Sequence, residues 1–284
     1  MATLLKVKPV VDHMAVDLRS RIEALKSRGV EPTLALVRMG ERPDDLSYER
    51  TAKKRAASLG LATKPYVLDD LAPQAAVQAT LQSINYDKTV HGCLMFRPLP
   101  SFLDEKALCN MLSPEKDIDG ISLASLASVF TDSSDGFPPC TAQACVEILD
   151  FYKIPLVGKH VVVIGRSLVV GRPLSMLLQA RDATVTLCHS RSRDLPGLCQ
   201  RADILVAAAG SPGLIGKEHL SPGQTVIDVG INTVRGRLCG DVRFDEAEAI
   251  VQRISPVPGG VGAVTTAVLA KHLIDAAEKT ALPG

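Results

Sequence analysis

The first half of the chain alternates between helical and strand-like patterns of apolar side chains. From Val11 to Leu25, apolar residues recur at offsets of three, four and seven, which is the period of a helix with one buried face. The apolar run 33–37 is too short for a helix, so we expect a buried strand there. A second helix is expected over 46–59, because Gly60 supplies its C-terminal cap.

The alternation continues beyond that cap. A strand is expected around 66–68, a helix around 75–84 and a buried strand at 92–96. Strands that alternate with helices are typical of a parallel sheet covered by helices. The first half is therefore expected to be an α/β domain.

A cluster of turn formers at 132–139 marks the expected crossing into a second domain. The alternation then restarts, with helices between at least the first pair of strands, and predicts a doubly wound sheet. A final apolar helix is expected over 265–277, and the pattern assigns it to neither half. The strands of the second half are expected at 161–164, 184–187, 204–207 and 226–229.

Composition and charge narrow the class of partner. At roughly 150 residues per domain, 284 residues make about two domains. The 32 basic and 31 acidic residues leave a net charge of +1, which provides no general field for nucleic acid or an anionic membrane. Aromatic residues are 4% of the chain and there is no Trp, which argues against a surface that stacks bases. The expected partner is a small molecule.

Targeting and cysteine patterns add two expectations. The N-terminal sequence lacks the apolar stretch of a signal peptide, and no run approaches the length that spans a bilayer, so we expect a cytoplasmic protein. The seven cysteines are an odd number without a C-x-x-C pair. We therefore expect reduced thiols packed as small hydrophobes, with neither a disulfide framework nor a zinc site.

A glycine-containing loop at 165–173 follows a predicted strand and precedes a predicted helix. Gly165 and Gly171 allow the backbone to approach a ligand, and Pro173 suits a first helical turn. The N–H groups at a helix N-terminus favour a phosphate-bearing ligand. Because the spacing is not G-x-G-x-x-G, a plain tight turn is the alternative.

The end of the next strand bears on the choice of dinucleotide. An acidic residue at this place would hold the ribose hydroxyl of NAD, whereas hydroxyls and arginines suit the 2′-phosphate of NADP. No acid occurs before Asp194. Arg166, Ser190 and Arg191 therefore favour NADP, against the alternative of a solvated basic loop. His189 is interpreted as a structural histidine.

Two acids, Asp117 and Asp119, flank one apolar residue just before Gly120. Without further oxygen ligands nearby, a calcium site is not expected, and no other metal site is predicted. The pair gains meaning from a set of blocks that occur in this order along the chain. They are Pro98-Leu99-Pro100, Lys116 to Gly120, Pro139-Cys140-Thr141, Gly165-Arg166-Ser167, Val170-Gly171, Ala183 to Thr186, Cys188-His189-Ser190, Val226 to Asn232, Gly240-Asp241-Val242 and Pro256 to Gly262.

Together these blocks resemble the methylenetetrahydrofolate dehydrogenase/cyclohydrolase family over nearly the whole chain. The resemblance implies an N-terminal α/β catalytic, folate-binding domain (1–138 with 266–284). It also implies a Rossmann-like, doubly wound, parallel-sheet domain for NADP (139–265), with the active-site cleft between the two. It further implies tetrahydrofolate one-carbon derivatives as substrates and a homodimer.

Site residues follow from the same resemblance. Tyr48 matches the tyrosine that stacks on the pterin, and Asp119 matches the aspartate that binds its amino-pyrimidine edge. Arg97 precedes the Pro98 block and is included with the substrate-binding residues. The substrate-contacting strip is Pro258, Gly259, Gly260, Val261 and Gly262. The cofactor positions are Gly165, Arg166, Ser167, Gly171, Ser190, Arg191 and Ile231.

Two positions depart from the family pattern. The family's catalytic lysine falls four residues after the tyrosine, where this chain has Ala52. Lys53 lies about 140° around a helix from Tyr48 at about 100° per residue, so it is a surrogate only if the helix is slipped or distorted. The glutamine that binds that lysine is replaced by Phe96. Losing both groups is chemically coherent, because a lone glutamine would be poorly satisfied.

These departures affect the two family reactions differently. Hydride transfer to the nicotinamide needs positioning, whereas hydrolysis of the methenyl product needs a placed acid–base group. We therefore expect an NADP-dependent dehydrogenase with weak or absent cyclohydrolase activity. The alternatives are the ordinary bifunctional enzyme, in which Lys53, Arg97 or ordered water acts, a non-catalytic paralogue that binds NADP or folate, and a dehydrogenase for an altered one-carbon donor.

Overall fold

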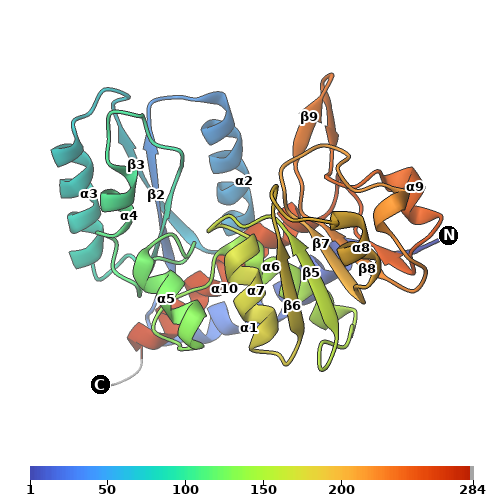
Figure 1. The fold of residues 1–284 in the computed structure, drawn as a ribbon. Helices are drawn as coiled ribbons and strands as arrows, with labels where there is room; N and C mark the ends of the chain where they lie inside the picture. Colours follow the sequence, from blue (N-terminus) through green and yellow to red (C-terminus); the bar gives the residue numbers. More distant parts are fainter. Residues whose placement is uncertain (282–284) are drawn as a thin grey trace. The chain divides into compact units, whose positions relative to one another are not determined.

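The computed structural model describes residues 1–281 and contains two compact units. One consists of Met1–Asp12 and Thr141–Thr265, and we call it the six-strand unit. The other consists of His13–Cys140 and the chain from Thr266 on, and we call it the three-strand unit. Every strand pair in the two main sheets is parallel (Figure 1), which confirms the predicted two-domain α/β class.

The three-strand unit has the sheet order β3-β2-β4. Its sheet is covered by helices on both sides, with α2 and α3 on opposite faces in Figure 1. The face toward α3 is a continuous apolar core that joins Val37 and Met39 to Val77 and Leu81. The elements are β2 (Thr33–Met39), α2 (Pro43–Leu59), β3 (Ala62–Leu68), α3 (Gln74–Tyr86), β4 (Gly92–Met95), α4 (Glu105–Cys109) and α5 (Leu123–Thr131).

The six-strand unit has the sheet order β1-β11-β8-β7-β5-β6. Its central strands are buried on both faces, as is expected for the apolar runs of a parallel sheet. A separate antiparallel hairpin, β9 (Asn232–Val234) with β10 (Arg237–Cys239), follows β8. The other elements are β1 (Thr3–Leu4), β5 (His160–Ile164), α7 (Gly171–Gln179), β6 (Thr184–Cys188), α8 (Leu195–Gln200), β7 (Ile204–Ala207), η1 (Lys217–His219), β8 (Thr225–Asp228), α9 (Phe244–Glu248) and β11 (Arg253–Ile254).

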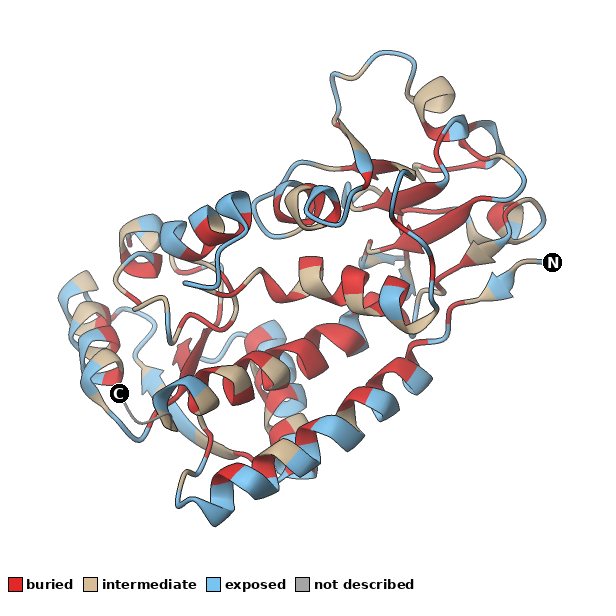
Figure 2. Cartoon of the chain, turned by 90° about the horizontal axis from the view of Figure 1, so that it is seen from below, coloured by how far each residue is buried: buried red, intermediate tan, exposed pale blue. Residues whose placement is uncertain are grey.

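Three further helices are α1 (Val7–Ser27), α6 (Cys140–Phe151) and α10 (Val261–Ala281). The predicted helical period of α1 is confirmed, and Figure 2 shows its buried side and its exposed side along the whole length. Arg21 ties α1 to α10, because its guanidinium lies 2.5 Å from carboxylate oxygens of both Asp275 and Glu278. In the described part of the chain, no helix combines the length and apolarity that a membrane span requires.

Some boundaries differ from the sequence prediction for physical reasons. Residues 1–12, expected with the N-terminal domain, belong to the six-strand unit because β1 pairs with β11. Helix α2 begins at Pro43, three residues before the prediction, since proline is accommodated in a first helical turn. Helix α10 begins at Val261, not 265, directly after the loop Pro256 to Gly260. All seven cysteines are free thiols, as expected.

Candidate functional site

The loop from β5 to α7 is shaped by its glycines. Gly165 has φ +117°, and a Cβ there would overlap the carbonyl oxygen of Ala208. At Gly171 a Cβ would overlap the carbonyl oxygen of Gly165. Ser167 closes the turn, because its hydroxyl accepts a hydrogen bond from Val170 N at 3.1 Å. The loop therefore packs backbone against backbone, which larger residues would prevent.

A cavity of about 510 Å³ opens beside this loop. It lies at the carboxyl ends of three adjacent strands, β5, β6 and β7, which is where open α/β sheets bind their ligands. The structure thus brings Gly165, Arg166 and Ser190 together as the sequence predicted. The cavity is lined by Ile164, Gly165, Arg166, His189, Ser190, Ser192, Leu195, Ala209, Ser211 and Leu214.

In the loop after β6 the basic side chains are exposed, whereas the acidic side chain of Asp194 binds the first turn of α8. Arg191 in this loop is exposed, as is Arg166 in the loop after β5. The Asp194 side chain caps α8, accepting from Gly197 N at 3.1 Å. His189 has a structural role, as predicted, because its Nδ1 accepts from Arg191 N at 3.1 Å. The first acid after β6 is therefore committed to a helix cap.

Two buried carboxylates that the sequence analysis did not single out organise the loops beside this cavity. Asp241 accepts hydrogen bonds from the backbone N–H groups of Ala209, Gly210 and Ser211 at 2.7–2.9 Å, and from the Asn232 amide. Asp228 accepts from three more backbone N–H groups, including that of Asp241. Burial, and to a smaller extent Asp241, raises the pKa of Asp228 to about 6, although its hydrogen bonds oppose that rise. Only the arrangement of loops in space reveals this role.

Ile231 and the predicted substrate strip form a second part of the six-strand unit's site. They line one cavity of about 150 Å³, which also includes Leu238 of the hairpin. Gly262 lies so close to Ile231 that a Cβ would be 3.3 Å from Ile231 Cδ1. The strip Pro258 to Gly262 ends as the first turn of α10. The structure therefore joins a predicted cofactor residue to predicted substrate residues.

In the three-strand unit, Tyr48 and Phe96 form an aromatic pair. Their ring centroids are 5.9 Å apart and the planes are nearly perpendicular, at 89°. Phe96 is only 4% exposed, whereas Tyr48 is 37% exposed. Burial and the neighbouring charge of Asp119 raise the pKa of Tyr48, so its hydroxyl is neutral. Tyr48 and Asp119, which the sequence assigned to the same ligand, are thus neighbours in the structure.

Asp119 is the carboxyl group of this site. Burial raises its pKa to about 6, and Asp117 adds to that rise, while Arg97 and a hydrogen bond with Cys140 act in the opposite direction. The Arg97 guanidinium also lies 3.8 Å from Glu105. Asp119 is therefore mainly ionised near neutral pH and is able to accept hydrogen bonds from N–H groups of a ligand.

At position 52 of α2 the side chain is a methyl group, which supplies no acid–base function. Ala52 is 3% exposed and lies one helical turn after Tyr48. Lys53 points its amine to Glu49, at 2.5 Å. Glu49 is itself buried and receives a second hydrogen bond from Arg38 at 2.7 Å. The α-helix is regular through this stretch, so the slipped or distorted helix that would make Lys53 a surrogate is not observed.

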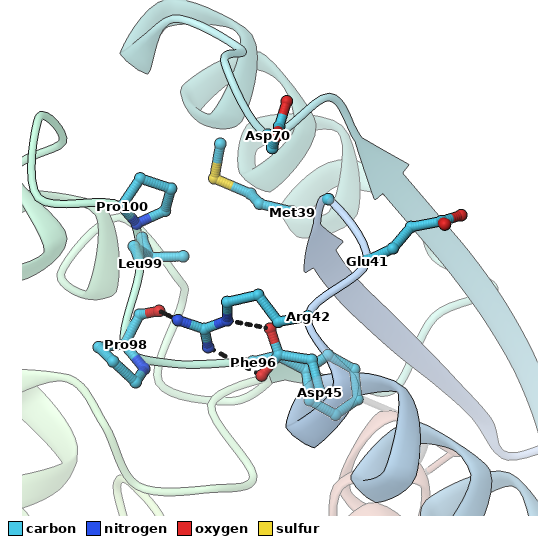
Figure 3. A pocket seen from close by; sticks show the side chains of 10 residues that line it. Met39, Glu41, Arg42, Asp45, Asp70, Phe96, Pro98, Leu99 and Pro100 are labelled. Carbon is cyan, nitrogen blue, oxygen red and sulfur yellow. Dashed lines mark hydrogen bonds and ion pairs between the residues drawn. The ribbon is translucent and has the colours of Figure 1, made fainter.

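Figure 3 shows a cavity of about 340 Å³ beside Phe96. Arg42 spans it, with its guanidinium paired to both carboxylate oxygens of Asp45 at 2.8–2.9 Å and to the carbonyl oxygen of Pro98 at 2.7 Å. These bonds connect the first turn of α2 to the loop after β4.

Comparisons with known proteins agree with this geometry. Residues 5–119 match the family described as tetrahydrofolate dehydrogenase/cyclohydrolase, catalytic domain, and residues 139–281 match the NAD(P)-binding domain of that family. The bifunctional protein FolD of Carboxydothermus hydrogenoformans is 48% identical over 281 residues, covering 98% of each chain.

Solved structures give the same result. The bifunctional FolD methylenetetrahydrofolate dehydrogenase/cyclohydrolase of Campylobacter jejuni matches with a TM-score of 0.96 and 33% identity, over 98% of this chain and 99% of that one. The enzyme of Trypanosoma brucei, complexed with NADP cofactor and inhibitor, matches with a TM-score of 0.91 and 33% identity, over 98% of each chain. The expectation of a dinucleotide cofactor domain is thereby confirmed, as an NAD(P)-binding domain.

Proposed function

The chain belongs to the tetrahydrofolate dehydrogenase/cyclohydrolase family, and on that premise we propose that it is an NADP-dependent dehydrogenase with weak or absent cyclohydrolase activity. Its reaction is the oxidation of 5,10-methylene-tetrahydrofolate to 5,10-methenyl-tetrahydrofolate by hydride transfer. The observation that carries the proposal is the buried Ala52, with Phe96 packed edge-on against Tyr48.

The preference for NADP rests on the loops after β5 and β6. Arg166 and Arg191 are exposed beside the cavity at the end of the sheet, where a 2′-phosphate would need positive charge. Asp194 is occupied as a helix cap and does not present its carboxylate to a ribose hydroxyl. Bound NADP supplies the hydride acceptor, while Gly165, Ser167 and Gly171 allow its phosphates to approach the α7 N-terminus.

On the folate side, Tyr48 offers the exposed face of its ring to the pterin. The edge-on contact with Phe96 restricts rotation of that ring, so the stacking surface is preorganised. The Asp119 carboxylate accepts hydrogen bonds from the amino-pyrimidine edge. We assign Arg97 and the strip Pro258 to Gly262 to substrate binding as well.

Hydride transfer and hydrolysis place different demands on these residues. The cation formed by oxidation is stabilised by the substrate's own nitrogens, so proximity and orientation supply most of the catalysis, up to about 7–11 kcal/mol. Ring opening of the methenyl compound requires water addition and proton transfer, to which a placed group contributes typically about 10²–10⁴-fold. Ala52 and Phe96 supply no such group. Lys53 would have to leave the buried Glu49 to reach the substrate.

The second candidate is the bifunctional enzyme, which the names of the relatives favour. In that case Lys53, Arg97 or ordered water delivers the proton.

One assay separates the dehydrogenase without cyclohydrolase activity from the bifunctional enzyme. Purified protein receives methylene-tetrahydrofolate and NADP⁺, and NADPH and the methenyl compound are followed at separate wavelengths. Methenyl-tetrahydrofolate is then supplied alone, and NAD⁺ replaces NADP⁺ in a parallel run.

NADPH formation with accumulation of the methenyl compound supports the dehydrogenase-only proposal. Enzymatic loss of that compound at a rate comparable to its formation favours the bifunctional enzyme. If neither NADPH nor the methenyl compound changes, and calorimetry shows that both ligands bind, the result favours a non-catalytic binder. Ala52→Lys with Phe96→Gln is the matched gain-of-function variant, and Ala52→Lys alone is its control, because the lysine then lacks a polar partner.

We also propose that the protein is a homodimer, as the family resemblance implies. Sedimentation of the purified chain with and without NADP tests this part. A monomer at the concentrations of the assay would contradict it, without affecting the assignment of the reaction.

A further inference from the structure

Two buried side chains converge on the peptide bond that precedes Asp119. His272 of α10 is 3% exposed, and its Nδ1 lies 2.9 Å from the carbonyl oxygen of Ile118. Cys140, the first residue of α6, is 2% exposed, and its Sγ lies 3.2 Å from the same oxygen and 3.7 Å from His272 Nδ1. All four residues belong to the three-strand unit. The peptide group between Ile118 and Asp119 is therefore contacted by two residues that are distant in the sequence.

The chemistry of the Ile118 carbonyl determines the state of His272. A carbonyl oxygen only accepts hydrogen bonds, so an imidazole nitrogen 2.9 Å away carries the proton. Burial lowers the pKa of His272 to about 4, which makes the ring neutral at physiological pH. The tilted ring of Phe137, with a centroid distance of 5.0 Å, holds the imidazole in place. His272 thus donates from Nδ1 and satisfies the Ile118 carbonyl by itself.

This leaves the Cys140 proton available for a second acceptor. The thiol has one S–H. Its Sγ lies 3.2 Å from the Ile118 carbonyl oxygen, and the Asp119 carboxyl group is a neighbouring acceptor. An ionised carboxylate is a stronger acceptor than a carbonyl oxygen that already receives a bond. When Asp119 is ionised, the thiol donates to it. When Asp119 is protonated, its own O–H donates and the thiol turns to Ile118.

We propose that His272 and Cys140 are positioning residues that form a hydrogen-bond chain behind Asp119 and keep its carboxylate oriented and ionised for the amino-pyrimidine edge of the folate. The inference rests on the proposed function, because it assumes that Asp119 receives the substrate. It adds a role for two side chains that do not touch the reacting atoms.

The electrostatic surroundings make the thiol donor important. Facing Asp119 are Arg97 from the loop after β4, Tyr48 from α2, Cys140 from α6 and Asp117 from its own segment. Facing His272 are Asp117 from that segment and, on its own helix, Lys271 and Asp275. Burial raises the pKa of Asp119 to about 6, so loss of one donor moves its titration into the range of neutral pH.

The first test compares Cys140→Ala with Cys140→Ser. In the alanine variant, we expect the acidic limb of kcat/KM for methylene-tetrahydrofolate to move to higher pH, and kcat/KM below that limb to fall by roughly three- to tenfold. KM for NADP should stay unchanged. The serine variant retains an O–H donor and should restore the wild-type profile. Cys145→Ala is the matched control, because Cys145 is buried on the same helix and donates only to Thr141 within it.

The second test uses His272→Phe, which keeps a ring against Phe137 but removes the donor. The Ile118 carbonyl then competes for the Cys140 proton, so the acidic limb should move in the same direction as in Cys140→Ala. Because the two residues act through one chain, the double variant should show no larger shift than either single variant. A purely structural role would lower kcat/KM equally at every pH.

An infrared measurement tests the chain without turnover. The S–H band of Cys140, identified by difference from Cys140→Ala, should move with pH in the wild type and stay fixed in Asp119→Asn. A pH-independent band, or an unchanged acidic limb in both Cys140→Ala and His272→Phe, overturns the inference. A wild-type protein that oxidises no methylene-tetrahydrofolate overturns the proposed function and the substrate role given to Asp119, while the infrared band still decides whether the hydrogen-bond chain exists.

Discussion

The loops around the cavity of the six-strand unit and the surroundings of Tyr48 in the three-strand unit differ in what determines their shape. The loops are packed backbone to backbone at Gly165 and Gly171, and Asp241 holds the loop after β7 through main-chain N–H groups. The surroundings of Tyr48 depend on side chains, above all on the ring of Phe96. A substitution among such side chains changes the local chemistry while the fold persists, whereas the backbone loops tolerate few substitutions.

The most severe disruption is expected from Gly171→Ala. The added Cβ would overlap the Gly165 carbonyl oxygen, and backbone there has no room to move. We expect NADP affinity to fall at least about 100-fold, with destabilisation of about 2–4 kcal/mol from overpacking and backbone shift. NADP titration and thermal unfolding measure both effects. Gly158→Ala is the control for backbone strain without overlap, because Gly158 has φ +70° but its Cβ would meet no atom within 4 Å; it should lose stability and keep its NADP affinity. Normal NADP affinity in Gly171→Ala would contradict the backbone-built site.

A smaller loss is expected from Asp241→Asn. The amide has one acceptor oxygen in place of two and adds N–H groups where four donors already point at the site. Hydrogen bonds to charged groups contribute about 1.5–3 kcal/mol, so KM for NADP should rise roughly 10- to 100-fold. Steady-state kinetics with each substrate varied separates this from folate binding, whose KM should change little. The exposed Asp245→Asn serves as the control.

The two units share one electrostatic feature that sharpens the comparison. Asp119 and Asp228 each have a native pKa of about 6, raised by burial above the value of about 3.9 expected in the unfolded chain. Each native carboxyl binds more protons than its unfolded counterpart between about pH 4 and 6. Its contribution to stability is therefore present below about pH 4, is lost as pH rises to about 6, and is constant above that.

Asp119→Asn should remove this pH dependence for the three-strand unit. We expect the variant to gain about 1–2 kcal/mol relative to the wild type between pH 4 and pH 7, because the neutral amide carries no ionisation penalty. Urea unfolding at a series of pH values measures the difference. A constant difference between the two proteins over that range would show that Asp119 titrates elsewhere.

The smallest effect is expected from Lys53→Ala. Lys53 is half-exposed and pairs with Glu49, which keeps its bond to Arg38 in the variant. We expect dehydrogenase kcat/KM to change by less than about twofold, with a stability loss of about 0.3–1 kcal/mol. The coupled NADPH assay checks the first value, and Arg55→Ala on the same helix is the control. A large loss of methenyl hydrolysis in Lys53→Ala alone would favour the bifunctional enzyme.

The repeating strand and helix pattern was predictable because buried parallel strands are continuous apolar runs. The strands at 161–164 and 204–207 were identified on this basis. The hairpin β9–β10 was missed, since its residues are mostly exposed and carry no such run. The place of residues 1–12 depends on pairing with β11 about 250 residues later, which no local pattern encodes.

Site residues were predictable from the sequence where they lie next to the end of a predicted strand. Gly165, Arg166 and Ser190 are close to strand ends and do line one cavity. The tertiary contacts of His272 and Asp241 were not predictable, because nothing in their immediate neighbours indicates a partner. The sequence led us to predict that Ala52 occupies the position of the family's lysine, but the ion pair between Lys53 and Glu49 is visible only in the structure.

The pairing of β1 with β11 has a consequence for biosynthesis. Thr3 and Leu4 are synthesised 250 residues before their partners Arg253 and Ile254, so β1 is paired only after β11 has been made. The three-strand unit likewise includes the chain from Thr266 on. Neither unit is complete until residues beyond 250 have been synthesised, so fragments cut at residue 140 would each lack a necessary element. The two halves are thus expected to mature together, and not as modules released one after the other.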